Sequence, residues 1–182
     1  MNFKSSPQII GVCASEHNIG STHVSMALSN YLCNKKLGKT AYIEINASNE
    51  VFSIGEKDVF DFMNITFYSS VTHSRLSEIL QKNYNYFVLD FGTINEFTIK
   101  EFMRCDIRIA LCSHSPWKKK SLSHFICFLK AQNVNIAKDI KLLGNLVEKK
   151  TSKHFDSVPF IPNPFLLTSQ YFWFLENFLE RN

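Results

Sequence analysis

An apolar strand that leads through a short polar loop into a helix is the feature of this sequence that most constrains its fold. Gln8–Ala14 (QIIGVCA) has the continuous apolar character of a buried strand. Over Gly20–Lys36 the apolar residues recur at helical spacing, namely Val24, Ala27, Leu28, Tyr31 and Leu32. Gly38 ends this helix, because glycine tolerates the left-handed conformation that follows a helix C-terminus. This order of elements is the first half of a βαβ unit.

The same alternation continues along the chain. Further strands are predicted at Thr40–Asn46, Met63–Tyr68, Tyr86–Asp90, Ile107–Cys112, Lys141–Val147 and Val158–Ile161. Further helices are predicted at Leu76–Lys82, Asn95–Arg104, Trp117–Ala131 (opened by Pro116) and Gln170–Arg181. Ala47–Asn64 is predicted to be an irregular connection. The pattern indicates an α/β fold: a doubly wound, mostly parallel sheet with helices on both faces, in three α/β/α layers.

Composition limits the class of protein. With 182 residues, of which 45% are hydrophobic, the chain is long enough for one domain over residues 1–182 with a large core. The 17 Phe and 16 Lys have A/T-rich codons, which fits an A/T-rich bacterial genome. The net charge of +4 is too small to indicate nucleic-acid binding, and the one basic-aromatic cluster is Trp117 followed by Lys118–Lys120.

No stretch of the sequence is apolar for long enough to form a transmembrane helix, and the polar start is unlike a signal peptide. We therefore expect a cytoplasmic protein. The five cysteines form no C-x-x-C pair and the six histidines form no H-x-x-x-H pair, so no metal site is expected from them. His17 and His114 both follow predicted strands, and they either face one pocket or are ordinary surface residues.

The loop after the first strand lies where a phosphate-binding loop would lie. The pattern G-x-x-x-x-G-K-[ST] falls on Ser15 to Thr22, and only Gly20 and Thr22 match it. Ser15 replaces the first Gly, and Ser21 replaces the Lys. In such a loop, backbone N–H groups hold the phosphates, the Lys reaches the β and γ oxygens, and the hydroxyl binds magnesium.

The flanking sequence supports this assignment. Glu16–Thr22 (EHNIGST) resembles the K-G-G-V-G-K-T loop of the MinD/ParA-type deviant Walker A P-loop NTPases. The next helix and strand resemble the family's A-x-x-L-A-x-x-L…G-K-x-V-x-x-I-D segment. Later matches are NYFVLDFG, CDIRIALCSHS, LLGNLV and VPFIP, in the family's order. Within the family the chain looks most like the TadZ/CpaE-like branch, whose members can carry degraded loops.

The resemblance implies a set of functional residues. Nucleotide contacts would come from Ser15, Glu16, His17, Asn18, Ile19, Gly20, Ser21 and Thr22, with Asn145 able to read the base. Thr22 and Asp90 would hold Mg, Asp90 through water. The family's Asp on the second strand falls on either Glu44 or Asn46. The implied cofactors are ATP or ADP with Mg, and the implied partner is a second copy or another protein.

Two departures from the family concern charge. The signature Lys of the family is Glu16 here, and the Walker Lys is Ser21. A triphosphate carries about four negative charges, so losing two ammonium groups from a dry site costs several kcal/mol of binding or transition-state stabilisation. In a chain with 16 Lys, the supply of Lys codons does not explain these losses. We therefore expect ATP hydrolysis to be absent.

These observations predict a catalytically degenerate MinD/ParA-like protein that acts as a regulatory, localisation or assembly factor, with nucleotide binding weakened or lost. One alternative is an ATPase with unconventional phosphate contacts, to which one of Lys118–Lys120 would contribute. Another is a module that binds anions through backbone amides alone. The aromatic terminal helix either packs on the sheet or forms a surface for a partner.

Overall fold

The computed structural model describes residues 6–45, 50–113, 115–145 and 156–180. Its centre is an eight-stranded sheet in the order β3-β4-β2-β5-β1-β6-β7-β8. The strands are β1 (Gln8–Ala14), β2 (Thr40–Glu44), β3 (Val59–Phe62), β4 (Ile65–Tyr68), β5 (Tyr86–Thr93), β6 (Ile107–Cys112), β7 (Lys141–Gly144) and β8 (Asp156–Ser157). All neighbouring strands are parallel except β3 and β4, which form an antiparallel pair at one edge.

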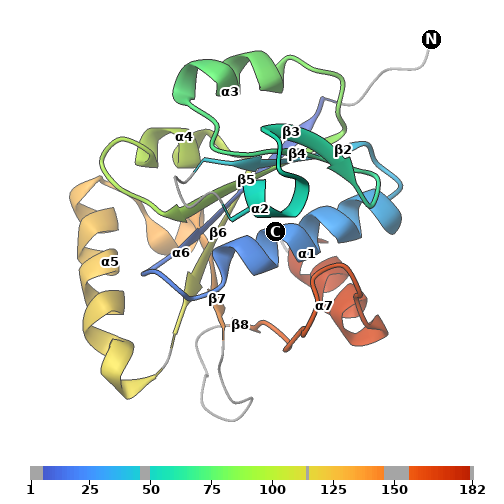
Figure 1. The fold of residues 1–182 in the computed structure, drawn as a ribbon. Coiled ribbons are helices and arrows are strands. Elements are labelled where there is room, and N and C mark those ends of the chain that lie inside the picture. Colours follow the sequence, from blue (N-terminus) through green and yellow to red (C-terminus); the bar gives the residue numbers. More distant parts are fainter. Residues whose placement is uncertain (1–5, 46–49, 114, 146–155, 181–182) are drawn as a thin grey trace.

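Helices cover both faces of this sheet (Figure 1). The helices are α1 (Ser21–Asn34), α2 (Phe52–Gly55), α3 (His73–Leu80), α4 (Ile99–Arg104), α5 (Lys119–Ala131), α6 (Ile136–Asp139) and α7 (Ser169–Glu180), and η1 (Pro116–Lys118) is a 3-10 turn before α5. Helices α1 and α7 pack on one face, whereas α3, α4 and α5 pack on the other. The predicted three-layer, mostly parallel α/β fold is therefore confirmed.

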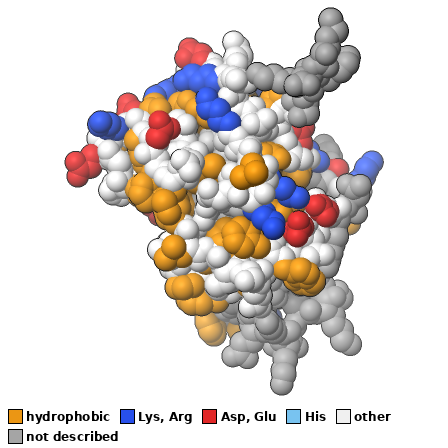
Figure 2. Space-filling view, turned by 90° about the vertical axis from the view of Figure 1, so that its right-hand side faces the viewer, with side chains coloured by type: hydrophobic (Ala, Val, Ile, Leu, Met, Phe, Trp, Pro, Cys, Tyr) orange, Lys and Arg blue, Asp and Glu red, His pale blue; other side chains and the backbone are white. Residues whose placement is uncertain are grey.

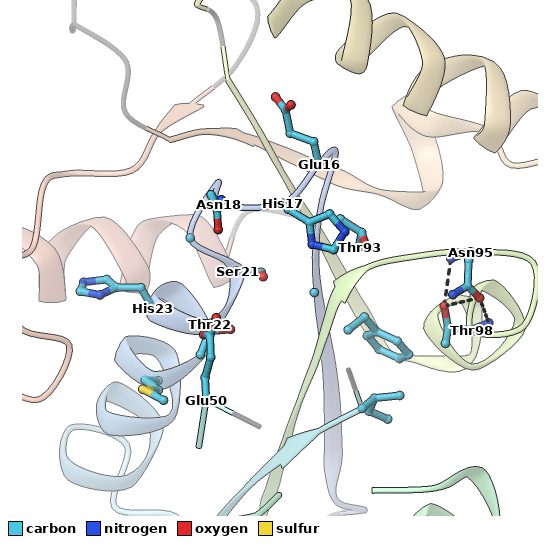
Figure 3. Close-up of a pocket in the computed structure, with 15 residues that line it drawn as sticks. Glu16, His17, Asn18, Ser21, Thr22, His23, Glu50, Thr93, Asn95 and Thr98 are labelled. Carbon is cyan, nitrogen blue, oxygen red and sulfur yellow. Dashed lines mark hydrogen bonds between the residues drawn. The ribbon is translucent and has the colours of Figure 1, made fainter. Parts of the chain in front are cut away.

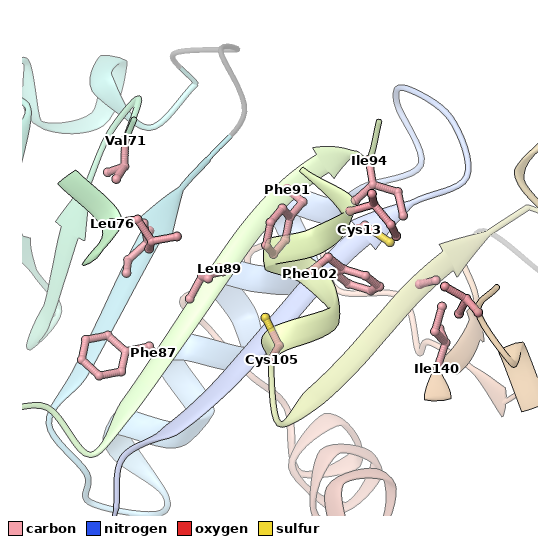
Figure 4. Packing of buried hydrophobic residues seen from close by; sticks show 14 of the residues in the cluster. Cys13, Val71, Leu76, Phe87, Leu89, Phe91, Ile94, Phe102, Cys105 and Ile140 are labelled. Atoms are coloured by element: carbon pink, nitrogen blue, oxygen red, sulfur yellow. The ribbon is translucent and has the colours of Figure 1, made fainter. Parts of the chain in front are cut away.

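The side chains of the central strands alternate between the two layers of helices. In β1, Ile10 and Val12 pack with α1 and α7, whereas Cys13 packs in the opposite cluster. In β5, Phe87 and Leu89 face that opposite cluster, which Figure 4 shows between the sheet and the helices. Because both faces of these strands are buried, their sequences are mostly apolar, and Asp90 in β5 is a buried exception.

The terminal helix is part of the core. Tyr171, Leu175 and Phe178 of α7 are buried against α1 and the sheet, so the expectation that this helix packs on the sheet is confirmed. Trp173, on the same helix, is 65% exposed. Among the described residues, no helix is long and apolar enough to cross a membrane.

One surface bears on the expected lack of a basic patch. Figure 2 shows the face at the right of Figure 1, where hydrophobic side chains form several separate groups and basic side chains lie beside acidic ones. Among the ion pairs of the described residues, one joins Lys36 to Glu180 at 3.1 Å. The mixed charges on this face are unlike a nucleic-acid surface, which is uniformly basic.

Two element predictions are wrong. A strand was expected at Val158–Ile161, but β8 covers only Asp156–Ser157. The backbone N–H of Val158 still reaches Gly144, whereas Pro159 has no N–H to continue the ladder. The described part of Ala47–Asn64 is not irregular, since it contains α2 and β3. Asn46, His114 and Val147 lie outside the described residues.

Candidate functional site

The loop that joins β1 to α1 is shaped as a cradle of backbone N–H groups. Its start is fixed to β6, because the N–H of Ser15 donates to the carbonyl of Leu111 at 2.9 Å. Asn18 and Gly20 have φ angles of 60° and 96°, in the left-handed region. Within the described part of the chain, the N–H groups of residues 18–22 have no acceptor, and no side chain caps α1. Unpaired N–H groups at a helix N-terminus attract anions.

A cavity of about 850 Å³ lies beside this loop, at the carboxyl ends of the central strands. Figure 3 shows the residues around it, which come from the loop, the first turns of α1, the connection between β2 and α2, the end of β5 and the segment that leads into α4. Its acidic lining residues are Glu16 and Glu50. Among the described residues that line it there is no Lys or Arg. The loop therefore presents backbone N–H groups to the cavity, whereas the charged side chains among its described lining residues are acidic.

Six of the predicted site residues line this cavity, namely Glu16, His17, Asn18, Gly20, Ser21 and Thr22. Ser15, Ile19, Asp90 and Asn145 do not line it. Ile19 is instead buried among the residues under α1. Asp90 lies behind Thr22 and accepts a hydrogen bond from its hydroxyl.

Asp90, in β5, is fully buried and accepts three hydrogen bonds. The hydroxyl of Thr22 donates to Oδ2 at 2.6 Å, the hydroxyl of Tyr42 donates to Oδ2 at 2.8 Å, and the N–H of Gly92 donates to Oδ1 at 3.0 Å. Burial raises the pKa of Asp90 above its ordinary value, while these three hydrogen bonds act in the opposite direction. The Thr22 hydroxyl lies at the cavity with Asp90 behind it. Hydroxyl and carboxylate oxygen atoms are ligands that suit Mg²⁺.

Glu16, at the position of the family's signature Lys, pairs with a basic residue from a different loop. The Nζ atom of Lys118 lies 3.2 Å from Oε1 of Glu16. Figure 3 shows the Glu16 side chain extending away from Thr22. Lys118 therefore lies at the edge of the loop between β1 and α1, and its charge is already matched by a carboxylate.

Asn145 follows β7 and contacts the backbone of the loop. Its side-chain Nδ2 donates to the carbonyl of Ile19 at 2.5 Å, and its N–H donates to the carbonyl of Cys112 at 2.9 Å. A Cβ atom on Gly20 would lie 2.8 Å from that Nδ2 atom. Asn145 therefore supports the loop, and Gly20 is the residue whose lack of a side chain allows the close approach.

The two candidates for the family's Asp on the second strand separate in the structure. The carboxylate of Glu44 is buried and accepts hydrogen bonds from the N–H groups of Val51 and Ser70, at 3.4 and 3.2 Å. Glu44 thus ties the connection after β2 to the end of β4 and does not line the cavity. The other candidate, Asn46, lies outside the described residues.

Several lining residues were not among the predicted site residues, namely His23, Glu50, Thr93, Asn95 and Thr98. Thr93 and Asn95 do fall in Asp90–Asn95, which follows a predicted strand and was expected on the ligand side of the sheet. Glu50 lies within Ala47–Asn64, the segment that was expected to be irregular, so periodicity carried no signal for it. His23 is one residue beyond the matched pattern, and its position in the first turn of α1 could have indicated it. The pairing of His17 with His114 stays a prediction, because His114 is not described.

Comparison with known proteins places the fold. No protein-family model and no curated protein matches the sequence. A plasmid partition protein from Borrelia burgdorferi, bound to AMPPNP, is 18% identical with a TM-score of 0.67, over 97% of this chain and 98% of that one. The MinD cell division protein of Aquifex aeolicus is 13% identical with a TM-score of 0.59, over 78% of this chain and 70% of that one.

A ParA family ATPase from Chlorobium tepidum is 10% identical with a TM-score of 0.56, and the match covers 76% of this chain and 73% of that one. These identities are low, but the likeness to the Borrelia protein extends over nearly the whole of both chains. The fold expected from the sequence resemblance is confirmed: this chain has the fold of the MinD/ParA-type P-loop NTPases.

Proposed function

We propose that this chain is a catalytically degenerate protein of the MinD/ParA fold, which binds the phosphate groups of a nucleotide weakly and does not hydrolyse them. The observation that carries the proposal is the contrast within one loop. The N–H groups of residues 18–22 have no acceptor among the described residues and can bind an anion, whereas Glu16 and Ser21 stand where the family has lysines. Weak binding without turnover suits a regulatory, localisation or assembly factor.

The loss of lysines affects catalysis more than binding. Phosphoryl transfer depends on positive charge that stabilises the transition state, and a missing cation at this point is worth several orders of magnitude in rate. Backbone N–H groups still bind the ground-state phosphate, because they need no particular side chain. Glu50 and Glu16 add negative charge beside the cavity, which further weakens the binding of a polyanion.

The oxygen atoms near the loop fit a magnesium ion that accompanies a nucleotide. Thr22 would hold it directly and Asp90 through water. When bound, the ion neutralises part of the phosphate charge. The Borrelia structure with AMPPNP supports a nucleotide as the ligand, since its fold matches along nearly the whole chain.

A protein partner or a second copy completes the proposal. A structure of the MinC:MinD cell division complex from Aquifex aeolicus matches this fold with a TM-score of 0.57. That protein acts with a partner, and a non-hydrolysing relative would exert its effect in the same way, through contacts with other proteins. We expect this activity in a bacterial cytoplasm.

Thermal unfolding in the presence of millimolar Mg-ATP, Mg-ADP or pyrophosphate tests the binding, because a ligand of the folded state raises the Tm. We expect a small increase with each ligand and no release of phosphate from ATP. Ser21→Lys should increase the shift, because it restores the Walker Lys. Ser77→Lys adds the same charge at an exposed position of α3 and should leave the shift unchanged. Absence of any shift, in the wild type and in Ser21→Lys alike, would rule out phosphate binding by this loop.

The second candidate function is an ATPase with unconventional contacts, and the position of Lys118 favours it. Its Nζ atom lies beside the loop, within 3.2 Å of Glu16. Phosphate release by the purified wild type, abolished in Lys118→Met, would establish this alternative. A response to pyrophosphate but not to either nucleotide would instead identify a module that binds anions through its backbone amides alone.

A further inference from the structure

We propose that Glu16 and Lys118 form a latch beside the phosphate loop, in which Glu16 acts as an internal anion and an incoming phosphate takes its place as the partner of Lys118. The proposal rests on the proposed function, since it concerns how the same cavity admits a phosphate. It assigns Lys118 as the cation of the site and Glu16 as the residue that controls its use.

The geometry of the latch is set by two neighbouring strands. Glu16 lies in the loop after β1, and Lys118 lies in η1, after the adjacent strand β6. Hydrogen bonds fix both backbones: Ser15 donates to Leu111 at 2.9 Å, and Lys118 donates to Ser115 at 2.8 Å. The two charged groups therefore meet without any movement of the sheet.

The ion pair is held loosely enough to exchange. The side chains of Glu16 and Lys118 are 24% and 28% exposed. Oε1 of Glu16 is itself shielded from water and accepts no hydrogen bond from the described residues, so Lys118 holds it through charge alone. Lysine carries its charge on a flexible stem with four carbons, which allows the ammonium group to follow a new partner. A phosphate dianion attracts this group more strongly than a single carboxylate does.

The charges around the latch explain why Lys118 is needed. No Lys or Arg is among the described residues that line the cavity, whereas Glu16 and Glu50 both line it and carry negative charge. Lys118 lies next to this lining, because its Nζ atom is 3.2 Å from Oε1 of Glu16. Helix α5 has no acidic residue in its first turn, which begins with Lys119 and Lys120. Cations at a helix N-terminus are unfavourable, and Glu16 offsets them from another element. Removing the Glu16 charge would thus free Lys118 and also lower the repulsion of an anion.

Isothermal titration calorimetry with pyrophosphate tests the latch in four variants. Glu16→Gln should bind about three- to tenfold more tightly than the wild type, because such charge interactions are each worth about 1 kcal/mol in a partly exposed site. Lys118→Met should bind more weakly by a similar factor. In the Lys118→Met background, Glu16→Gln should give much less gain, because no lysine is left to release. Lys119→Met is the matched control and should bind as the wild type does.

Salt dependence gives a second measurement. Affinity of Glu16→Gln for pyrophosphate should fall more steeply with salt than that of Lys118→Met, because one more cation contacts the ligand. Equal affinities of the wild type, Glu16→Gln and Lys118→Met would overturn the latch and leave the proposed phosphate binding intact. A loss in Lys119→Met as large as that in Lys118→Met would also overturn it, since only general charge would then matter. Absence of binding in every variant would overturn both proposals.

Discussion

The hydroxyl of Tyr42, in β2, donates a hydrogen bond of 2.8 Å to Oδ2 of Asp90, in the neighbouring strand β5. Both residues are fully buried. The same oxygen atom accepts a hydrogen bond from Thr22, at the start of α1. One buried carboxylate therefore joins β2 and β5 to the first turn of α1, directly after the loop that leads from β1.

Removing the Tyr42 hydroxyl should destabilise the protein measurably. Tyr42→Phe deletes a hydrogen bond to a buried carboxylate, and such bonds contribute about 1.5–3 kcal/mol. We expect the free energy of unfolding in urea to fall by this amount. Tyr86→Phe is the control, because the Tyr86 hydroxyl has no hydrogen-bond partner among the described residues. Equal stabilities of the two variants would show that the Tyr42 contact contributes nothing.

Asp90 should also make the stability depend on pH. Burial raises the pKa of Asp90 in the folded chain above the ordinary value of 3.8, which applies to the unfolded chain. At a pH between the pKa of the unfolded chain and that of the folded chain, the folded chain therefore holds more protons than the unfolded chain. The contribution of Asp90 to the free energy of unfolding is therefore largest in acid, and it falls as pH rises from about 4 through the raised pKa.

Asp90→Asn removes this titration. The difference in free energy of unfolding between the wild type and Asp90→Asn should shrink as pH rises through the same range, measured by urea unfolding at several pH values. A difference that stays constant, or that grows with pH, would contradict the raised pKa of Asp90.

The central strands and the loop could be predicted from the sequence because their residues are buried on both faces. Gln8–Ala14 was predicted with the bounds of β1, since a continuous apolar run of this length has few alternatives. The edge was harder: β3 exposes most of its residues, and its apolar Phe62 is 40% exposed. An edge strand packs one side only, so the pattern in its sequence is weak.

The candidate site was predictable as a segment but not as a set of contacts. The spacing from Ser15 to Thr22 indicated the loop, and six of its predicted residues line the cavity. The pairing of Glu16 with Lys118 joins residues 102 positions apart, and no local pattern contains that information. The same holds for Tyr42, whose contact with Asp90 depends on the order of strands in the sheet.

The five cysteines should differ strongly in reactivity. Cys127 is exposed, whereas Cys13, Cys105 and Cys112 are buried. Burial raises the pKa of Cys105 to about 12 and that of Cys112 to about 11, so little thiolate forms at neutral pH. Alkylation of the native protein should modify Cys127 first, then Cys33, whose thiol donates to the carbonyl of Asn64.

Mass spectrometry of the alkylated protein checks this order. Cys127→Ser should remove the fast phase of alkylation and leave the slower phases unchanged. Denaturation of the wild type in guanidinium should expose all five thiols. Rapid modification of Cys105 or Cys112 in the native protein would contradict their burial.

Gly20 should be the least replaceable residue of the phosphate loop. Its φ of 96° lies in the left-handed region, where an alanine costs about 1–2 kcal/mol. An added Cβ would also lie 2.8 Å from Nδ2 of Asn145, the atom that donates to Ile19. Gly20→Ala should therefore lower both the free energy of unfolding and the affinity for pyrophosphate. Combining it with Asn145→Ala separates the causes, because this second change removes the clash but not the backbone strain. We expect the two substitutions together to cost less than the sum of their separate effects, measured by urea unfolding, whereas strict additivity would mean that the clash is absent.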